Sequence, residues 1–223
     1  MKSTKSALLV ANGEFQPNLE SLLADDNFLI AVDGGLRHLL ALNHYPHLLL
    51  GDLDSITLQE MQACDEQGVE ILRFQPQKDE SDLELALLEA IKRGYRQLSI
   101  TNAAGGRIDH LLGNLSLLFH PALQLASVKI ITHTNIIHPL VGSITLPTQP
   151  GDLISLIPWQ GEVVGVITQG LAYPLHAETL LPYETRGISN VALGSQITVQ
   201  IKSGKLLLIH TPIQEKETPC PKN

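Results

Sequence analysis

The stretch EILRFQPQKDESDLELALLEAIKRGYRQLSIT, residues 70–101, holds a short apolar run, an amphipathic segment and a second short apolar run. Between Asp82 and Arg93, apolar residues recur at i, i+3, i+4, i+7 and i+8, so they share one face of a helix. Gly94 then supplies a stop signal at the helix C-terminus. A strand, a helix and a strand in this order predict part of an α/β fold.

The same alternation of strand and helix patterns continues through the first part of the chain, up to about residue 132. Further short apolar runs, each bounded by polar or turn residues, lie at 7–11, 28–32, 47–50 and 128–132. Such runs are typical of buried parallel strands. They predict an open, mostly parallel sheet flanked by helices, and sheets of this kind bind ligands at the carboxyl ends of their strands.

The pattern changes after about Asn135. Closely spaced β segments follow one another with frequent Gly and Pro and no convincing helix, at 153–157, 163–167, 196–201 and 205–210. This pattern indicates an all-β sandwich or barrel, and we take the sandwich. We therefore predict two domains, 1–134 and 135–223, the second ending in a loose polar tail.

The composition excludes several classes of protein. With 43% hydrophobic and 17% charged residues the chain can bury a core. A net charge of −8, of which −7 belongs to residues 1–134, argues against binding to nucleic acid or to anionic membranes. We find neither a membrane helix nor a signal peptide at the start MKSTKSALLVANGEF. We expect a cytoplasmic protein in which Cys64 and Cys220 are reduced.

Acidic residues gather where the predicted strands end. Asp33 follows one strand in DGG, and Asp52 and Asp54 follow the next in GDLDS. Two carboxylates at i and i+2 on such a turn can converge on a hard cation such as Mg²⁺. Turn formation or helix capping would explain an isolated pair of aspartates equally well.

A second acidic element, KDESD at 78–82, precedes the amphipathic helix. Ser81 and Glu84 have the spacing of a capping box, which needs no catalysis. This leaves Lys78, Asp79 and Asp82 unexplained. A lysine beside a helix N-terminus can bind phosphate, and Asp82 could reach a metal ion.

The third element is AAGGRIDHLLGN, residues 103–114, which again follows a predicted strand. Its glycines permit close approach of the backbone to a ligand, and Arg107 could contact a polyphosphate bidentately. The sequence contains neither GxxxxGK[ST] nor GxGxxG. Phosphate binding would have to be built from the acidic turns, Lys78, Arg107 and Mg²⁺.

Together these elements resemble a known family. The ordered motifs are DGG at 33–35, GDLDSI at 51–56, KDESDLELAL at 78–87, GGRIDHLLGN at 105–114, GLAYPL at 170–175 and GISN at 187–190. The set resembles thiamine pyrophosphokinase. The resemblance implies an N-terminal α/β domain that binds ATP, a C-terminal β-sandwich that binds thiamine, and a homodimer with active sites between subunits. The implied reaction is Mg²⁺-dependent and converts thiamine and ATP to thiamine diphosphate and AMP.

The resemblance also implies roles for individual residues. The catalytic residues and metal ligands would be Asp52, Asp54 and Asp82, and Asp52 or Asp54 would accept the hydroxyl proton of the substrate. ATP and its phosphates would be bound by Asp33, Lys78, Asp79, Ser81 and Arg107. Thiamine would be bound by Asp109, Tyr173, Ser189 and Asn190, although Asp109 could instead orient Arg107. Tyr173 stands where some family members have Trp, which keeps an aromatic face for the thiazolium cation.

Two alternatives remain open on the residues alone. GDLDSIT after an apolar strand also resembles the nucleophile loop of haloacid-dehalogenase phosphatases and phosphotransferases, in which Asp52 would be the nucleophile. The second alternative is a non-catalytic module that binds nucleotide or thiamine. Thiamine-dependent formation of AMP distinguishes the proposed enzyme from both.

Overall fold

The computed structural model describes residues 5–23 and 27–213. They form two compact units, divided between His133 and Thr134. Residues 215–223, for which we predict a loose tail, lie outside the described part of the chain. None of the described helices is long and apolar enough to cross a membrane.

The first unit contains a sheet whose described strands are all parallel. The strands are β1 (Ser6–Val10), β2 (Phe28–Val32), β3 (Leu48–Gly51), β4 (Glu70–Arg73), β5 (Gln97–Thr101) and β6 (Ser127–Ile131). Within this unit their order is β6-β5-β1-β2-β3-β4. Because apolar runs of four or five residues are too short to be buried as helices, they pair side by side as strands.

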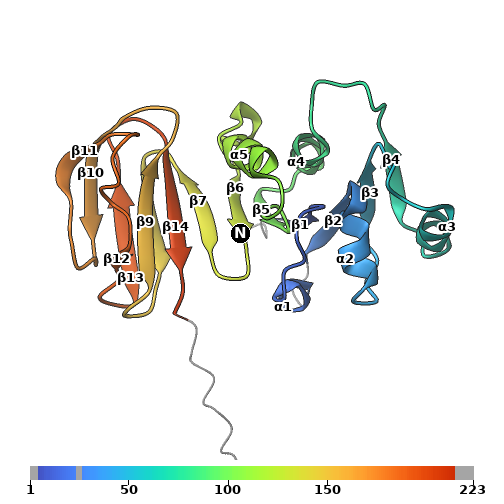
Figure 1. The fold of residues 1–223 in the computed structure, drawn as a ribbon, viewed down its shortest axis with the longest axis horizontal. Helices are drawn as coiled ribbons and strands as arrows, with labels where there is room; N and C mark the ends of the chain where they lie inside the picture. The colour runs from blue at the N-terminus through green and yellow to red at the C-terminus, as the bar shows by residue number, and fades with distance from the viewer. Residues whose placement is uncertain (1–4, 24–26, 214–223) are drawn as a thin grey trace, which may run out of the picture. The chain divides into compact units, whose positions relative to one another are not determined.

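Helices cover both faces of this sheet. They are α1 (Leu19–Leu23), α2 (Leu36–Leu40), α3 (Leu58–Glu66), α4 (Asp82–Lys92) and α5 (Ile108–Leu117). Strand residues such as Leu8 and Val10 share one core with apolar residues of α1, α2 and α3. Because side chains alternate between the two faces of a sheet, the same strands present a second set of apolar residues on the other face. The helix α4 contacts β1, β2 and β3, and Figure 1 shows it on the opposite side of the sheet from α2. The predicted α/β architecture is confirmed.

The stretch from β4 to β5 has the predicted form. Ser81 caps α4, since its Oγ accepts a hydrogen bond of 3.2 Å from the backbone N of Glu84. Gly94 has φ of 89°, which permits the helix to stop there. A complete capping box occurs instead at α3, where Thr57 and Glu60 exchange both hydrogen bonds.

A topological switch point lies between β1 and β5. The chain runs outward from β1 through β2 and β3 to β4, then returns to place β5 on the other side of β1. The carboxyl ends of the strands at such a point form a crevice, which is the usual place for a ligand in such sheets.

The DGG motif connects β2 directly to α2 through one short 3-10 turn, Asp33–Gly35. Gly35 is required by packing, because a Cβ there would overlap the carbonyl oxygen of Val10 at the end of β1. The close approach brings the ends of the two neighbouring strands together. The motif therefore holds Asp33 at the carboxyl edge of the sheet.

The second unit is a sandwich of two antiparallel sheets, as predicted. Its strands are β7 (Ile136–Leu140), β8 (Ser143–Pro147), β9 (Leu153–Pro158), β10 (Val163–Gln169), β11 (His176–Leu180), β12 (Asn190–Val191), β13 (Gln196–Gln200) and β14 (Leu206–Thr211). Within this unit one sheet has the order β12-β9-β14-β7 and the other β11-β10-β13-β8. Buried residues of both sheets, such as Leu156, Val199 and Leu208, form a single core.

One polar pair is buried in this sandwich. The Nε2 of His210 in β14 lies 2.7 Å from Oδ2 of Asp152, and the two side chains are 10% and 4% exposed. Asp152 also accepts hydrogen bonds of 2.9 Å from the backbone N of Gln149 and of Ile213. The carboxylate thus links the start of β9 to the end of β14.

Candidate active site

A pocket of about 740 Å³ lies at the carboxyl edge of the sheet in the first unit. It is lined by residues that follow β1, β2, β3 and β5, together with the segment that leads into α4. Its volume lies within the roughly 300–1,000 Å³ of small-molecule sites. The pocket is thus where the strand order predicts a ligand.

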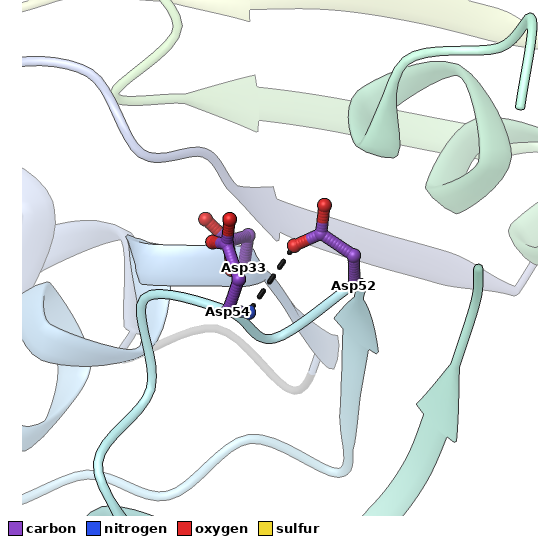
Figure 2. A group of neighbouring side chains, drawn as sticks. All are labelled: Asp33, Asp52 and Asp54. Carbon is purple, nitrogen blue, oxygen red and sulfur yellow. Dashed lines mark hydrogen bonds between the residues drawn. The ribbon is translucent and has the colours of Figure 1, made fainter. Parts of the chain in front are cut away.

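Three carboxylates converge at this edge. Asp33 follows β2, while Asp52 and Asp54 follow β3, and each offers an oxygen within 4.8 Å of the others. Figure 2 shows the three side chains together, with the hydrogen bond of 3.2 Å from the backbone N of Asp54 to Oδ1 of Asp52. Three negative charges this close repel one another unless a cation binds among them.

Two backbone positions in this cluster are strained. Asp33 has φ of 47° and Leu53 has φ of 60°, both in the left-handed region that side chains with a Cβ rarely adopt. Ser55 Oγ donates to both carboxylate oxygens of Asp33 at 3.1 Å, and Asn12 Nδ2 lies 3.4 Å from Oδ2. These hydrogen bonds fix the direction in which the carboxylate of Asp33 points. Strained backbone positions of this kind are common at functional sites.

The segment before α4 places Lys78 and Asp82 in the pocket lining. Their side chains form an ion pair of 2.6 Å between Nζ and Oδ1, and Lys78 Nζ lies 5.7 Å from the ring centre of Phe74. Of the three expected metal ligands, Asp52 and Asp54 lie together, and the structure adds Asp33 to them. The third, Asp82, forms its ion pair with Lys78 instead. Asp79 is exposed and lies outside the pocket lining, which includes Glu80 instead.

The loop after β5 supplies the glycines and Arg107 to the pocket. Arg107 pairs with Asp109 at 2.5 Å, and both side chains are largely exposed. The hydrogen bonds from Arg107 are the main reason that the pKa of Asp109 falls to about 2. Asp109 is therefore ionised at neutral pH and is a weak proton acceptor; it lies outside the pocket lining, whereas His110 lies within it.

Sequence reasoning missed the polar residues that join the loops after β1 and β5. The backbone N of Gly13 donates to the carbonyl of Asn102 at 2.7 Å, and Asn102 Nδ2 donates to the carbonyl of Glu14 at 3.1 Å. Asn114 Nδ2 donates to the carbonyl of Ala103 at 2.9 Å. The sequence NGE at 12–14, directly after the first strand, could have indicated this loop.

The residues expected to bind thiamine lie in the second unit, apart from Asp109. Tyr173 and Asn190 line a pocket of about 160 Å³ that also includes Arg186, and Tyr173 is 71% exposed. Asn190 is buried and exchanges hydrogen bonds of 3.0 and 2.7 Å with the backbone of Tyr173. Ser189 is exposed and lies outside this pocket lining. Asn190 thus holds the segment that presents the tyrosine ring.

Two family models match the chain. The model described as "Thiamin pyrophosphokinase, catalytic domain" matches residues 19–131. The model described as "Thiamin pyrophosphokinase, vitamin B1 binding domain" matches residues 143–206. The first match covers the acidic cluster and the pocket lining except for the residues of the loop after β1, and the second covers most of the sandwich.

Individual relatives agree with the family models. The thiamine pyrophosphokinase of Bacillus subtilis (strain 168) is 29% identical over 211 residues, which span 93% of this chain and 99% of the relative. The crystal structure of the B. subtilis enzyme superposes with a TM-score of 0.84 at 28% identity, covering 94% of this chain and 100% of that chain. The crystal structure of a thiamin pyrophosphokinase family protein from Enterococcus faecalis superposes with a TM-score of 0.81 at 27% identity. The match covers 94% of this chain and 100% of that chain.

The resemblance inferred from the six motifs is confirmed by these matches. Neither the haloacid-dehalogenase-like phosphatase nor the non-catalytic binding module is supported by them.

Proposed function

The chain belongs to the thiamin pyrophosphokinase family, and on that premise we propose that it transfers the pyrophosphoryl group of ATP to the hydroxyl of thiamine. The products are thiamine diphosphate and AMP. The observation that carries this proposal is the convergence of three carboxylates, those of Asp33, Asp52 and Asp54, at the edge of a pocket. Asp33 and Asp52 line this pocket together with Lys78 and Arg107. Carboxylates beside cationic side chains suit a triphosphate that arrives with a metal ion.

The chemistry of the acidic cluster fits Mg²⁺. This ion prefers oxygen ligands, usually a few carboxylates together with water and phosphate oxygens, and the cluster offers three carboxylates. Once bound, the ion would neutralise charge on the phosphates. We propose Asp33, Asp52 and Asp54 as its ligands, with Asp82 joining them when a phosphate replaces it as the partner of Lys78.

The remaining task of the protein is to position the reactants. The hydroxyl of thiamine must lie in line with the departing AMP at the β-phosphorus, and charge must be stabilised in the transition state. Lys78 and Arg107 bind the phosphates as cations, and Ser81 and Asp79 belong to the loop that carries Lys78. Asp52 or Asp54 accepts the hydroxyl proton.

We propose that thiamine binds against Tyr173 in the sandwich unit, with Ser189 and Asn190 forming the neighbouring turn. The matching family model is described as a vitamin B1 binding domain, which supports this assignment. An exposed aromatic ring suits the thiazolium cation, because cations are attracted to the face of an aromatic ring.

Replacing Tyr173 with alanine should raise the KM for thiamine roughly 2- to 30-fold, because a cation–π contact contributes about 0.5–2 kcal/mol. The KM for ATP should change by less than about twofold, and steady-state kinetics with each substrate varied separately measures both values. Tyr183→Ala is the matched control, since this tyrosine is 80% exposed in the same unit but outside the pocket lining. An equal rise in both KM values would remove Tyr173 from the thiamine site.

We propose a cytoplasmic homodimer with active sites between its subunits. The exposed apolar side chains of α5 support a partner surface: Ile108 is 73% exposed and Leu112 is 50% exposed, and no residue of this helix is buried. Apolar surface of this kind is often covered by a partner subunit.

The central test is an assay for AMP with purified protein, ATP, thiamine and Mg²⁺. We expect AMP and thiamine diphosphate in equal amounts, and no AMP when thiamine or Mg²⁺ is omitted. Light scattering on the same sample should give twice the chain mass of 24.3 kDa. ADP as product would indicate a simple kinase, and a phosphate trapped on Asp52 would indicate an aspartyl-phosphate mechanism; either result would overturn the proposal.

A further inference from the structure

Glu14 is a pocket residue to which the family resemblance assigns no role. It lies in the loop after β1, at the switch point, and lines the same pocket as Asp33 and Asp52 of the acidic cluster. Asn12, two residues earlier, contacts Asp33 of that cluster. Glu14 itself contacts the loop after β5, on the other side of the crevice.

Several hydrogen bonds fix the position of Glu14. Its backbone N donates to the carbonyl of Ala104 at 3.2 Å, and its carbonyl accepts from Asn102 Nδ2 at 3.1 Å and Gln16 Nε2 at 3.2 Å. Its side-chain Oε1 accepts from the backbone N of Gly106 at 3.0 Å. Glu14 is exposed, yet hydrogen bonds hold both its backbone and its carboxylate.

The glycine loop is shaped around this carboxylate. A Cβ on Gly105 would lie 2.6 Å from Oε2 of Glu14 and closer still to its Cδ, so no larger residue fits there without moving the glutamate. Gly105 also has φ of 102°, which favours glycine. The carboxylate is therefore preorganised at the point where the two loops meet.

The charge of Glu14 restricts what it can bind. An ionised carboxylate only accepts hydrogen bonds, and it repels phosphates. Among the residues that the structure describes, no lysine, arginine or histidine forms an ion pair with Glu14. A group that donates hydrogen bonds suits this carboxylate, and a nucleotide offers such donors in its ribose hydroxyls.

We propose that Glu14 accepts hydrogen bonds from the ribose hydroxyls of the nucleotide and so selects ribonucleotides over deoxyribonucleotides. The inference deepens the proposed function and rests on it. An acidic residue also accepts a hydrogen bond from the ribose in dinucleotide-binding sheets. The ribose then lies at the junction of the β1 and β5 loops, and the phosphates extend toward Lys78 and the acidic cluster.

A double-mutant cycle tests the proposal, with ATP, 2′-deoxy-ATP and 3′-deoxy-ATP as probes. For the wild type, removal of at least one hydroxyl should lower kcat/KM about tenfold or more, which corresponds to about 1.4 kcal/mol. In Glu14→Ala, kcat/KM for ATP should fall by a similar factor, mainly through KM. The penalty for the deoxynucleotides should then shrink to within about twofold, and Glu14→Gln should lie between. Glu20→Ala, an exposed glutamate of α1, is the control.

The same nucleotides are also titrated calorimetrically without thiamine, which separates this proposal from the proposed reaction. Loss of hydroxyl discrimination in Glu14→Ala would support the role of Glu14 even if no AMP were formed. If the wild type does not discriminate, or if Glu14→Ala discriminates as strongly as the wild type, the proposal is wrong. Glu14 would then only brace the glycine loop.

Discussion

Replacing Asp54 with asparagine should reduce kcat/KM at least about 100-fold, on the order of 3 kcal/mol of barrier. The substitution removes one of three charged groups whose oxygens lie within 4.8 Å of one another, while keeping the size of the side chain. Asp54 is exposed, so the free energy of unfolding should change by no more than about 0.5 kcal/mol. Steady-state kinetics over a range of Mg²⁺ concentrations measures the loss, and thermal unfolding measures the stability.

Metal binding gives a second measurement that does not depend on turnover. Mg²⁺ should raise the Tm of the wild type, because it relieves the repulsion among the three carboxylates, and should raise that of Asp54→Asn less. Asp65→Asn is the matched control, since Asp65 is an exposed aspartate of α3 outside the pocket lining. Near-normal turnover together with an unchanged response to Mg²⁺ would show that the cluster is not the metal site.

Replacing Asp152 with alanine should lower the free energy of unfolding of the sandwich unit by about 3–5 kcal/mol, the usual cost of breaking a buried pair. The change leaves buried His210 without its carboxylate, and the backbone N–H groups of Gln149 and Ile213 without their acceptor. Trp159 is the single tryptophan of the chain and lies in this unit, so its fluorescence during denaturant unfolding reports the effect.

The contribution of Asp152 to the free energy of unfolding should depend on pH. Burial raises the pKa of its carboxyl, but the hydrogen bonds from Gln149, Ile213 and His210 together outweigh burial, so the pKa lies below its usual value. A carboxyl whose pKa is lower in the folded state stabilises the fold fully at pH values above its pKa in the unfolded state, about 3.9. This stabilisation is lost as the pH falls through the pKa of the folded state. The difference between wild type and Asp152→Ala should therefore be largest near neutral pH and shrink in acid.

Two further variants make this test decisive. Asp152→Asn keeps the shape and one acceptor oxygen, so it should fold and lose less stability than Asp152→Ala. Glu162→Ala removes an exposed carboxylate of the same unit and should change stability by no more than about 0.5 kcal/mol. If Asp152→Ala unfolds at the same denaturant concentration as Glu162→Ala, the buried pair does not stabilise the sandwich.

Local patterns were sufficient to predict the strands of the first unit and its helix α4. The periodicity at 82–93 corresponds to α4, and each of the six apolar runs corresponds to a strand within one or two residues at its ends. These features depend on neighbouring residues, which is why they can be inferred from the sequence. In the second unit the pattern located β9, β10, β13 and β14 but did not name β7, β8, β11 or β12. In β8, for example, side chains alternate between exposed and half-buried and form no continuous apolar run.

The sequence by itself determined the order of the motifs, the change of period near residue 134, and the position of the acidic residues at strand ends. Only the tertiary structure decided which of these groups meet. It joined Asp33 to Asp52 and Asp54, paired Asp82 with Lys78, and placed Glu14 against Gly106, 92 positions away in the chain. The physical reason is that periodicity acts over a few neighbouring residues, whereas the convergence of side chains depends on strand order and on the direction in which each loop leaves the sheet.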